Sequence, residues 1–291
     1  MQRKLISFDW AIKRILRSKA NFEILEGFLS ELLKEDIKIL EILESESNKD
    51  SKEDKSNQVD IKVKNSNDEI VIIEIQYSRE LDYLQRMLYA TSKVVIEHIS
   101  QGYAYSKIKK VISINILYFD FDFGDGDDYI YKGTTNFEGI HTHNKLYLNE
   151  IQKDLYKTNE INKIYPEYYL IKVKNFDDNS KDTLDEWINF LKNETISDNP
   201  KAKGLLKAKE TLDYLNMPDD EKLDYDRREE NLRREASVYE STYIAGGIEA
   251  TKIRNIEIAK NLLDVLDIET IALKTGLSLQ EVKNLTKHSS Q

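Results

Sequence analysis

A carboxylate and an amide interrupt an otherwise apolar stretch in the first third of the chain. The segment Glu69–Tyr77 reads EIVIIEIQY, so Glu74 and Gln76 lie two residues apart among isoleucines and valines. Residues two apart in a strand point to the same face of the sheet. A carboxylate that is buried without a partner is costly. Glu74 therefore needs compensation, and a bound cation is the simplest form of it.

A second carboxylate, Asp60, lies on the preceding alternating segment, QVDIKVK at 58–64, on the face opposite its valines and isoleucine. The two segments are typical of a β-hairpin. With a two-residue loop, Asp60 would face Ile73 and the carboxylates would point to opposite sides. We predict instead a three-residue loop, 66–68, which sets Asp60 opposite Glu74 with Cβ atoms ~5 Å apart.

Two carboxylates at that separation repel each other unless a hard cation lies between them. Mg²⁺ prefers oxygen ligands and keeps coordination positions for water and phosphate. A metal in such a position can lower the pKa of a bound water and bind a phosphate oxygen. The hairpin therefore predicts a Mg²⁺ site, in which Mn²⁺ is able to substitute.

The elements that position these residues follow from apolar periodicity. Helical spacing predicts helices over 5–33 and 79–100. The polar segment 44–57 predicts a loop, and the acidic run 120–128 predicts a turn. Further strands are predicted over 111–119, 129–133, 144–148 and 168–174. This order of helix, hairpin, helix and strand predicts an α/β fold in which helices cover the sheet.

After about residue 180 only helical patterns occur, over 181–196, 201–216, 219–242 and 248–266. Two short helices then follow around Thr275 and Gly276. Ser278, with Glu281 three residues later, forms a capping box for the second of them. We therefore predict a first domain over 1–178 and a helical C-terminal extension over 179–291, which ends in a helix-turn-helix-like pair.

Composition limits the function further. The 291 residues include no cysteine, which excludes disulfides, a thiolate zinc site and a cysteine nucleophile. No apolar run approaches the ~18 residues that span a bilayer, so we expect a soluble, cytoplasmic protein without a membrane partner. The net charge is −10. It argues against coating nucleic acid through bulk charge but allows DNA to bind locally at a carboxylate metal site.

The motifs and their order resemble the PD-(D/E)XK nuclease superfamily, and within it the recombination-promoting nuclease and transposase family. The matching pieces occur in the family's order, over about 6–175 and again over 247–287. They are FDWAIK at 8–13, VDI at 59–61, IEIQ at 73–76, RMLYATS at 86–92, QGY at 101–103, VISINILY at 111–118 and IEIAKNLL at 256–263. The resemblance implies a restriction-endonuclease-like fold, with a central mixed β-sheet flanked by helices.

The resemblance also implies an activity and a set of site residues. The activity is Mg²⁺-dependent endonuclease cleavage of DNA, in recombination, mobile-element biology or phage defence. Asp60 and Glu74 would be metal ligands, with the Ile75 carbonyl as a further candidate. Gln76 stands where most of the superfamily has lysine, and an amide can orient water but cannot take a proton. The outer candidates are Asp9 for the metal, Lys13 for the missing positive charge, and Arg86 and Tyr89 for phosphate.

Other interpretations remain open at this stage. Asp9 and Lys13 have the i, i+4 spacing of a surface ion pair. The chain could also be a catalytically weak or inactive DNA-binding or oligomerising module on a nuclease fold, or a helical scaffold for protein partners. A homodimer is one further hypothesis, since cutting both DNA strands needs two active sites or a reorientation.

Overall fold

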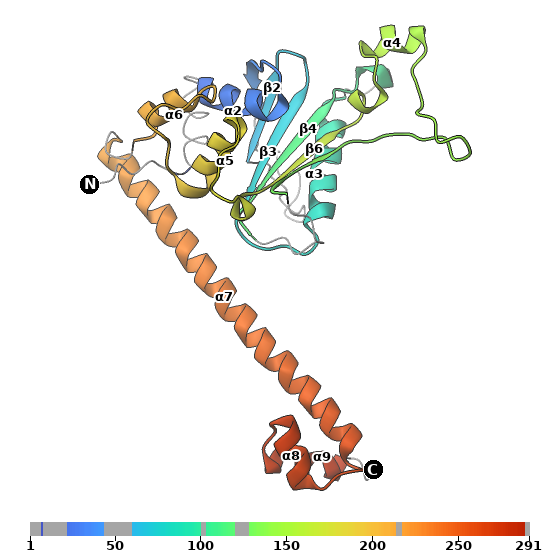
Figure 1. Ribbon diagram of the computed structural model, residues 1–291, viewed down its shortest axis with the longest axis vertical. Coiled ribbons are helices and arrows are strands. Elements are labelled where there is room, and N and C mark those ends of the chain that lie inside the picture. Colours follow the sequence, from blue (N-terminus) through green and yellow to red (C-terminus); the bar gives the residue numbers. More distant parts are fainter. Residues whose placement is uncertain are drawn as a thin grey trace. The chain divides into compact units, whose positions relative to one another are not determined.

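The computed structural model describes Ser7 and residues 22–43, 60–99, 103–119, 128–213 and 217–288 (Figure 1). Asp9, Lys13, the polar segment 44–57 and nearly all of the acidic run 120–128 lie outside the described residues. The chain forms two compact units, Met1–Lys222 and Leu223–Gln291. The first contains the sheet and the second contains helices.

The sheet of the first unit has six strands in the order β1-β2-β3-β4-β6-β5. Their bounds are β1 Ile39–Ile42, β2 Ile61–Asn65, β3 Ile70–Gln76, β4 Val111–Leu117, β5 Ile130–Gly133 and β6 Glu167–Lys172. The three central strands β3, β4 and β6 run parallel, and the outer pairings are antiparallel. The sheet is therefore mixed, and β3 joins its antiparallel part to its parallel part.

The hairpin β2–β3 has the predicted register. Ile61 pairs with Ile73 and Lys64 with Ile70, so residues 66–68 form a three-residue loop. The last loop residue, Asp68, has φ 62°, as this loop type requires, and aspartate tolerates that left-handed conformation. The prediction of a three-residue loop is confirmed.

Asn65 holds this loop in shape. Its side chain is fully buried, and its Oδ1 accepts the backbone N–H groups of Asn67 at 3.0 Å and Glu69 at 2.9 Å. Its Nδ2 donates to Glu69 Oε2 at 2.8 Å. The Asn65 side chain thus makes the hydrogen bonds that main-chain groups would otherwise make at the turn. These bonds stabilise the loop length and the hairpin register, and the position of Asp60 depends on that register.

We expect Asn65→Ala to lower the free energy of unfolding by about 2 kcal/mol, because it removes a fully buried side chain and leaves the N–H groups of Asn67 and Glu69 without their acceptor. Urea unfolding followed by circular dichroism measures the change. Asn67→Ala is the matched control at the exposed loop tip and should change stability by less than about 0.5 kcal/mol. Equal effects of the two substitutions would contradict this role for Asn65.

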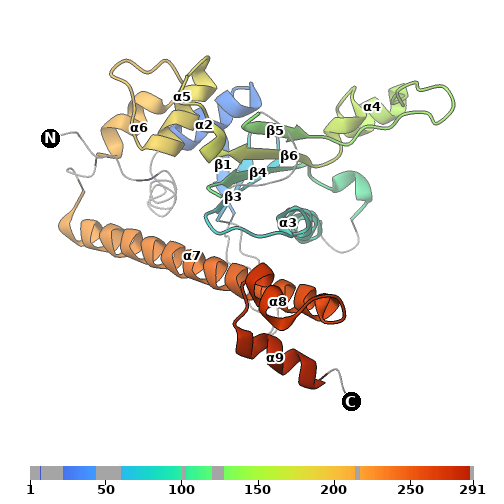
Figure 2. The same cartoon turned by 60° about the horizontal axis from the view of Figure 1, so that its bottom comes forward.

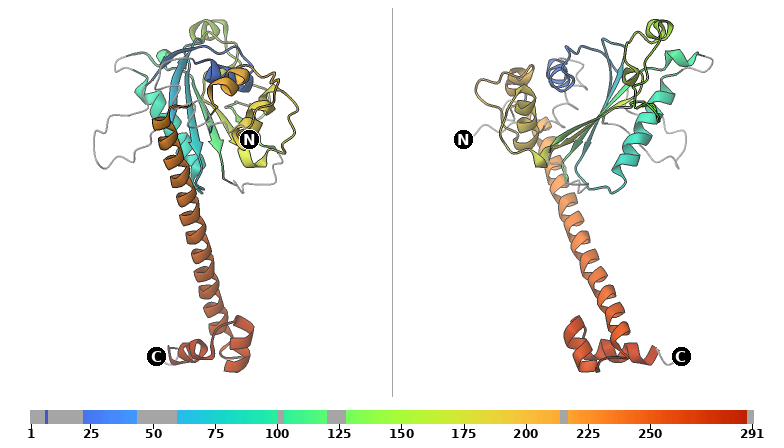
Figure 3. Two further views of the ribbon diagram at one scale, coloured as in Figure 1. Left: turned by 90° about the vertical axis from the view of Figure 1, so that its left-hand side faces the viewer. Right: turned by 45° about the vertical axis from the view of Figure 1, so that its right-hand side comes forward.

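Helices cover both faces of the sheet, as Figures 2 and 3 show from different directions. Helix α3, Tyr83–Glu97, packs on one face, where Val94 contacts Ile70, Ile72 and Val111. On the other side lie α2, Glu23–Leu33, and α5, Thr183–Asn193. Phe28 of α2 and Trp187 of α5 are fully buried there, with ring centroids 5.7 Å apart in a T-shaped contact. Because both faces are covered, β3 and β4 are mainly apolar.

Helix α6, Leu205–Thr211, belongs to the first unit together with α5, although both follow residue 178. Gly27 allows the backbone at Lys203 to approach α2 closely, since a Cβ atom at Gly27 would lie 2.2 Å from the carbonyl oxygen of Lys203. The Trp187 indole also donates to that oxygen, at 3.1 Å. The first compact unit extends to Lys222, and the domain boundary at 178 stays a prediction.

The long connection between β5 and β6 differs from the prediction. The strand predicted over 144–148 is wrong, because only Lys145 pairs there, in a single bridge with Glu138. Leu146 and Tyr147 are exposed, since no neighbouring strand covers them. The helix α4, Glu150–Tyr156, follows at once behind an Asn149 capping box. Neither α4 nor the short strand β1 was anticipated from periodicity.

The second unit consists of most of α7, Asp219–Leu262, followed by α8, Ile268–Thr275, and α9, Leu279–His288. The prediction of separate helices over 219–242 and 248–266 is wrong, because α7 runs unbroken through Gly246 and Gly247. The predicted short helix pair is confirmed, with Gly276 at φ 72° ending α8. Ser278 and Glu281 form the predicted capping box. No helix in the described part of the chain is long and apolar enough to cross a membrane.

Candidate active site

Asp60 and Glu74 face each other where the hairpin opens. Ile61 pairs with Ile73, so the next pair outward along the same register is Asp60 and Glu74. Asp60 continues the strand pairing through its side chain, because its Oδ2 accepts the N–H of Ile75 at 2.7 Å. The carbonyl of Ile75 lies on the same edge of β3 as this N–H. The hairpin thus brings both carboxylates and that carbonyl to one place.

The Glu74 carboxylate is largely buried beneath α3, with 13% of its side chain exposed. Its Oε1 accepts a hydrogen bond from Arg86 Nη2, on α3. Its Oε2 is buried and has no hydrogen-bond partner within the described structure. A buried carboxylate oxygen without a partner is a position at which a bound ligand is expected.

The environment raises the pKa of Glu74 to about 7. Burial is the largest cause, since it penalises the charged carboxylate, and the nearby charge of Asp60 acts in the same direction. Arg86 opposes both effects through its charge and its hydrogen bond. In the absence of metal, the site therefore holds a proton near neutral pH that an ordinary glutamate would have lost.

This raised pKa makes stability depend on pH. Between pH 4.5 and about 7 the folded chain holds a proton at Glu74 that the unfolded chain releases, so stability falls as the pH rises. The rise in the Glu74 pKa from 4.5 to about 7 corresponds to a loss of ~3 kcal/mol in the free energy of unfolding. Glu74→Gln removes this loss but weakens the contact with Arg86. We expect the variant to be about 2 kcal/mol more stable than the wild type at pH 8 and nearly equal to it at pH 5, in urea unfolding with EDTA.

Glu41→Gln, at an exposed position of β1, is the matched control and should change stability by less than about 0.5 kcal/mol at both pH values. A Glu74→Gln variant that is less stable than the wild type at pH 8 would contradict the raised pKa. So would a gain of equal size at pH 5 and pH 8.

Gln76 belongs to a small polar network beside the carboxylates. Its Nε2 donates to Glu80 Oε1 at 3.0 Å and to the Ser78 carbonyl at 3.1 Å. Glu80 Oε1 also accepts from Arg86 Nη1, at 2.6 Å. Arg86 therefore bridges two carboxylates, Glu74 and Glu80, and Gln76 is joined to this bridge through Glu80.

Two buried polar residues complete the site, and the sequence analysis did not assign either to it. Asn115 lies beside Glu74 on the neighbouring strand β4. Its Oδ1 accepts from the hydroxyl of Tyr83, on α3, at 3.0 Å. Burial raises the pKa of Tyr83 well above its ordinary value, and the charge of Glu74 adds to the effect. The signal for Asn115 was available, because it is an amide in the middle of the apolar segment VISINIL.

The other predicted site residues have different outcomes. Tyr89 lies one helical turn beyond Arg86 on α3 and is 54% exposed. The roles of Arg86 and Tyr89 in binding phosphate stay predictions. Asp9 and Lys13 lie outside the described residues, so their proposed roles also stay predictions.

The donors present fit a hard divalent cation. Asp60 and Glu74 supply carboxylate oxygens on facing strands, and Glu74 Oε2 is buried without a partner. No group of three or more histidine, cysteine, aspartate or glutamate side chains suited to a metal occurs within the described ranges. A metal held by two carboxylates would complete its coordination with water, substrate or a backbone carbonyl, which is typical of Mg²⁺ and unlike a closed structural zinc site.

The mixed sheet, the helices on both faces and the acidic pair on the β2–β3 hairpin define a restriction-endonuclease-like α/β fold. A model of the PD-(D/E)XK nuclease family transposases matches residues 6–242, and the chain belongs to this family. Comparison with curated proteins and with solved structures finds no match. The predicted family and fold class are therefore confirmed.

Proposed function

We propose that this protein is a DNA endonuclease that hydrolyses phosphodiester bonds with Mg²⁺, and that Mn²⁺ is able to replace Mg²⁺. The observation that carries the proposal is the pairing of Asp60 with Glu74, whose Oε2 is buried without a partner, in a chain of a nuclease family. Because burial raises the pKa of Glu74 to about 7, its carboxylate destabilises the folded chain near neutral pH. Such strain is typical of functional sites.

In this proposal Asp60 and Glu74 hold the metal, with the Ile75 carbonyl as an additional ligand. When bound, the metal supplies an activated water and neutralises charge on the phosphate. The chain's own residues would hold the two carboxylates in place and balance their charge. The N–H of Ile75 fixes the Asp60 carboxylate through the bond at 2.7 Å. Tyr83 and Asn115 fill the buried space beside Glu74 and exclude water from that side.

Gln76 and Arg86 have complementary roles in the proposal. The Gln76 amide can donate to or accept from a water, but it cannot remove a proton. Arg86 is the described cation in contact with Glu74, and it would supply positive charge for the phosphate. Tyr89, exposed one turn away, would contact the DNA backbone. We further propose that DNA is the partner and that Asp9 and Lys13 complete the site.

Cleavage of supercoiled plasmid tests the function. The purified full-length chain is incubated with plasmid in Mg²⁺, in Mn²⁺ and in EDTA, and nicked and linear products are measured with time. Nicking or linearisation in either metal but not in EDTA is the expected result. Folded protein that cleaves nothing with any metal but shifts DNA on a gel would overturn the proposal. That outcome would favour an inactive DNA-binding module, which the glutamine at position 76 would then explain.

A further inference from the structure

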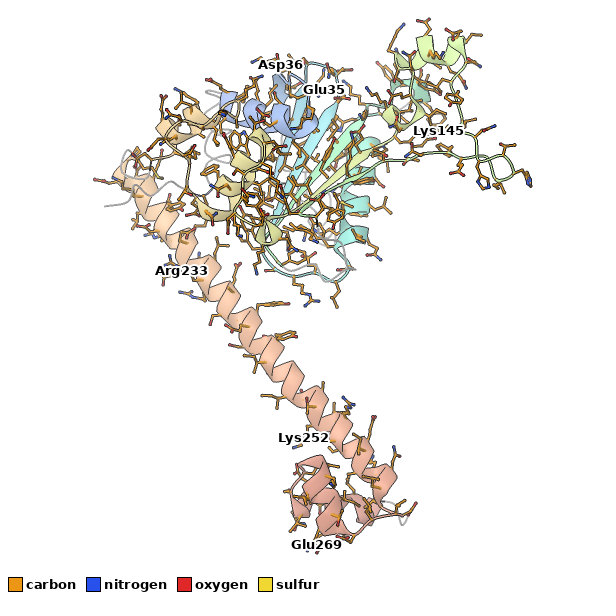
Figure 4. All side chains as sticks on the ribbon, viewed as in Figure 1. Glu35, Asp36, Lys145, Arg233, Lys252 and Glu269 are labelled. Carbon is orange, nitrogen blue, oxygen red and sulfur yellow. The ribbon has the colours of Figure 1, made fainter. Side chains whose placement is uncertain are left out.

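The last part of the chain folds into a small unit with a core of its own. Residues 252–262 of α7 pack with α8 and α9, and we call these elements the three-helix unit. Its buried core consists of Ala259, Ile271, Leu277 and Val282. Figure 1 shows both short helices beside the C-terminal end of α7, and Figure 4 labels Lys252 and Glu269 in this unit. The Asp60–Glu74 site uses residues of the first unit, so the three-helix unit has no part in it.

Helices α8 and α9 are joined as in a helix-turn-helix motif. The turn has three residues, 276–278, and Gly276 has φ 72°, a conformation that favours glycine. Leu277 is buried in the core of the unit, while Ser278 and Glu281 cap α9. Two helices joined by a short turn that contains glycine form the motif whose second helix enters the major groove of DNA.

Helix α9 has an apolar side and a polar side. Val282 is fully buried, and Leu285 packs against the same core. On the opposite side, Gln280, Lys283 and Asn284 recur at helical spacing, and all three are exposed. Gln280 Nε2 donates to Asn284 Oδ1 at 3.1 Å, so the two amides lie together. The outward side of α9 therefore presents two adjacent amides and an amine.

These side chains have the chemistry that reads base edges in the major groove. A glutamine or asparagine amide matches the N6 and N7 atoms of adenine, and a lysine matches the O6 and N7 atoms of guanine. In helix-turn-helix proteins, such contacts come from the N-terminal residues of the second helix. Gln280, Lys283 and Asn284 lie within the first two turns of α9, which begins at Leu279. Both their type and their place in the motif fit base readout.

The charge of the unit favours selective binding over bulk attraction. Residues 252–285 carry five bases and five acids, so net charge gives the unit no general affinity for phosphate. One of the acids, Glu281, is balanced by Lys252 at 3.0 Å. Lys260 and Lys274 are exposed and are available to contact a few phosphates. Phosphate contacts position a protein on DNA, whereas contacts to base edges decide which sequence is bound.

We propose that the three-helix unit binds duplex DNA with α9 in the major groove, where Gln280, Lys283 and Asn284 read base edges. This inference rests on the proposed function only in taking DNA as the partner. It gives the chain a second DNA contact, on a different compact unit from the catalytic pair. The contact through α9 selects the sequence that is bound, while Asp60 and Glu74 serve the reaction at the backbone.

Enrichment of bound sequences tests the proposal. The full-length chain is mixed with duplex DNA of randomised sequence in EDTA, which prevents metal-dependent cleavage, and the bound fraction is amplified and sequenced over several rounds. A short motif that contains adenine should be enriched. In fluorescence anisotropy it should bind at least ~100-fold more tightly than a shuffled duplex. A pool that stays random would overturn the proposal.

Substitutions on α9 test which side chains read the motif. Gln280→Ala and Asn284→Ala should each weaken binding to the motif about 10-fold and leave binding to the shuffled duplex within about twofold of the wild type. Asn261→Ala is the matched control, because it removes an exposed amide from α7 in the same unit. It should change both affinities less than about twofold. Full binding of the motif by both α9 variants would overturn the proposal.

An altered base tests the contact from the DNA side and does not depend on how a variant folds. Each adenine of the motif is replaced in turn by 7-deazaadenine, which lacks the N7 acceptor. At one adenine this change should weaken wild-type binding about 10-fold and should have little further effect on the variant that lacks the matching amide. Equal losses in the wild type and in both variants would overturn the assigned readout.

The outcome is separable from that of the nuclease proposal. Asp60→Asn should enrich the same motif as the wild type, because the selection takes place without metal. A chain that selects the motif but cleaves nothing would contradict the nuclease proposal and support this inference. A chain that cleaves plasmid but enriches no motif would do the reverse.

Discussion

Asp60→Asn and Glu74→Gln are each expected to lower the rate of metal-dependent plasmid cleavage by at least ~1,000-fold. A loss of this size corresponds to about 4 kcal/mol of transition-state stabilisation. Each substitution removes the charge of a carboxylate that we propose as a metal ligand, and it keeps the size of the side chain. The asparagine oxygen can still accept the N–H of Ile75, and the glutamine can still contact Arg86. The fold should therefore survive while the metal is lost.

Metal binding provides the second readout for these two variants. Mn²⁺ should raise the thermal midpoint of the wild type, because a ligand that binds only the folded state stabilises it, and it should not raise that of either variant. Glu97→Gln is the matched control on α3, where Glu97 pairs with Lys62 at 3.1 Å. It should cleave within about threefold of the wild type. Variants that keep full cleavage would show that these carboxylates are not the ligands.

Arg86→Met is expected to lower cleavage by about 100-fold and to destabilise the metal-free chain by about 3 kcal/mol at pH 8. The substitution leaves Glu74 and Glu80 near each other without the guanidinium that now bridges them. Removing one partner of a partly buried ion pair is destabilising, because the remaining charge on Glu74, which is largely buried, is left uncompensated. At pH 5 the loss should be smaller, since Glu74 is then protonated.

The Arg86 variant differs from the ligand variants in its response to metal. Asp60 and Glu74 remain, so Mn²⁺ should still stabilise Arg86→Met and should offset part of the lost stability by supplying positive charge. Lys93→Met on the same helix is the control, since its amine lies 3.9 Å from Glu97 and away from the site. If Arg86→Met cleaved at the wild-type rate, Arg86 would have no role beyond stabilising the metal-free site.

Much of the site was predictable because it depends on local rules. Alternation along 58–64 and the apolar run at 69–77 predict two strands, and the loop length between them decides which side chains meet. The three-residue loop places Asp60 opposite Glu74, as the pairing of Ile61 with Ile73 confirms. The family and the class of fold follow from the same motifs. The catalytic roles of these residues remain predictions.

The errors have a common physical origin in long-range packing. The segment 144–148 has strand-like alternation but finds no strand to pair with, so it stays irregular. Gly246 and Gly247 weaken a helix locally without ending it, so α7 continues through them. The short strand β1 has too few residues for a periodic signal and forms because β2 offers it a partner edge.

By itself, the sequence determined the hairpin, its register and the carboxylate pair, because alternation, turn chemistry and loop length act between neighbours in the chain. Only the tertiary structure decided what surrounds that pair. The contact of Arg86 with both Glu74 and Glu80, the bond from Tyr83 to Asn115 and the unpartnered Glu74 oxygen arise where α3 packs over β3 and β4. Burial and the charge of nearby side chains set the pKa of Glu74, and both depend on elements far apart in sequence.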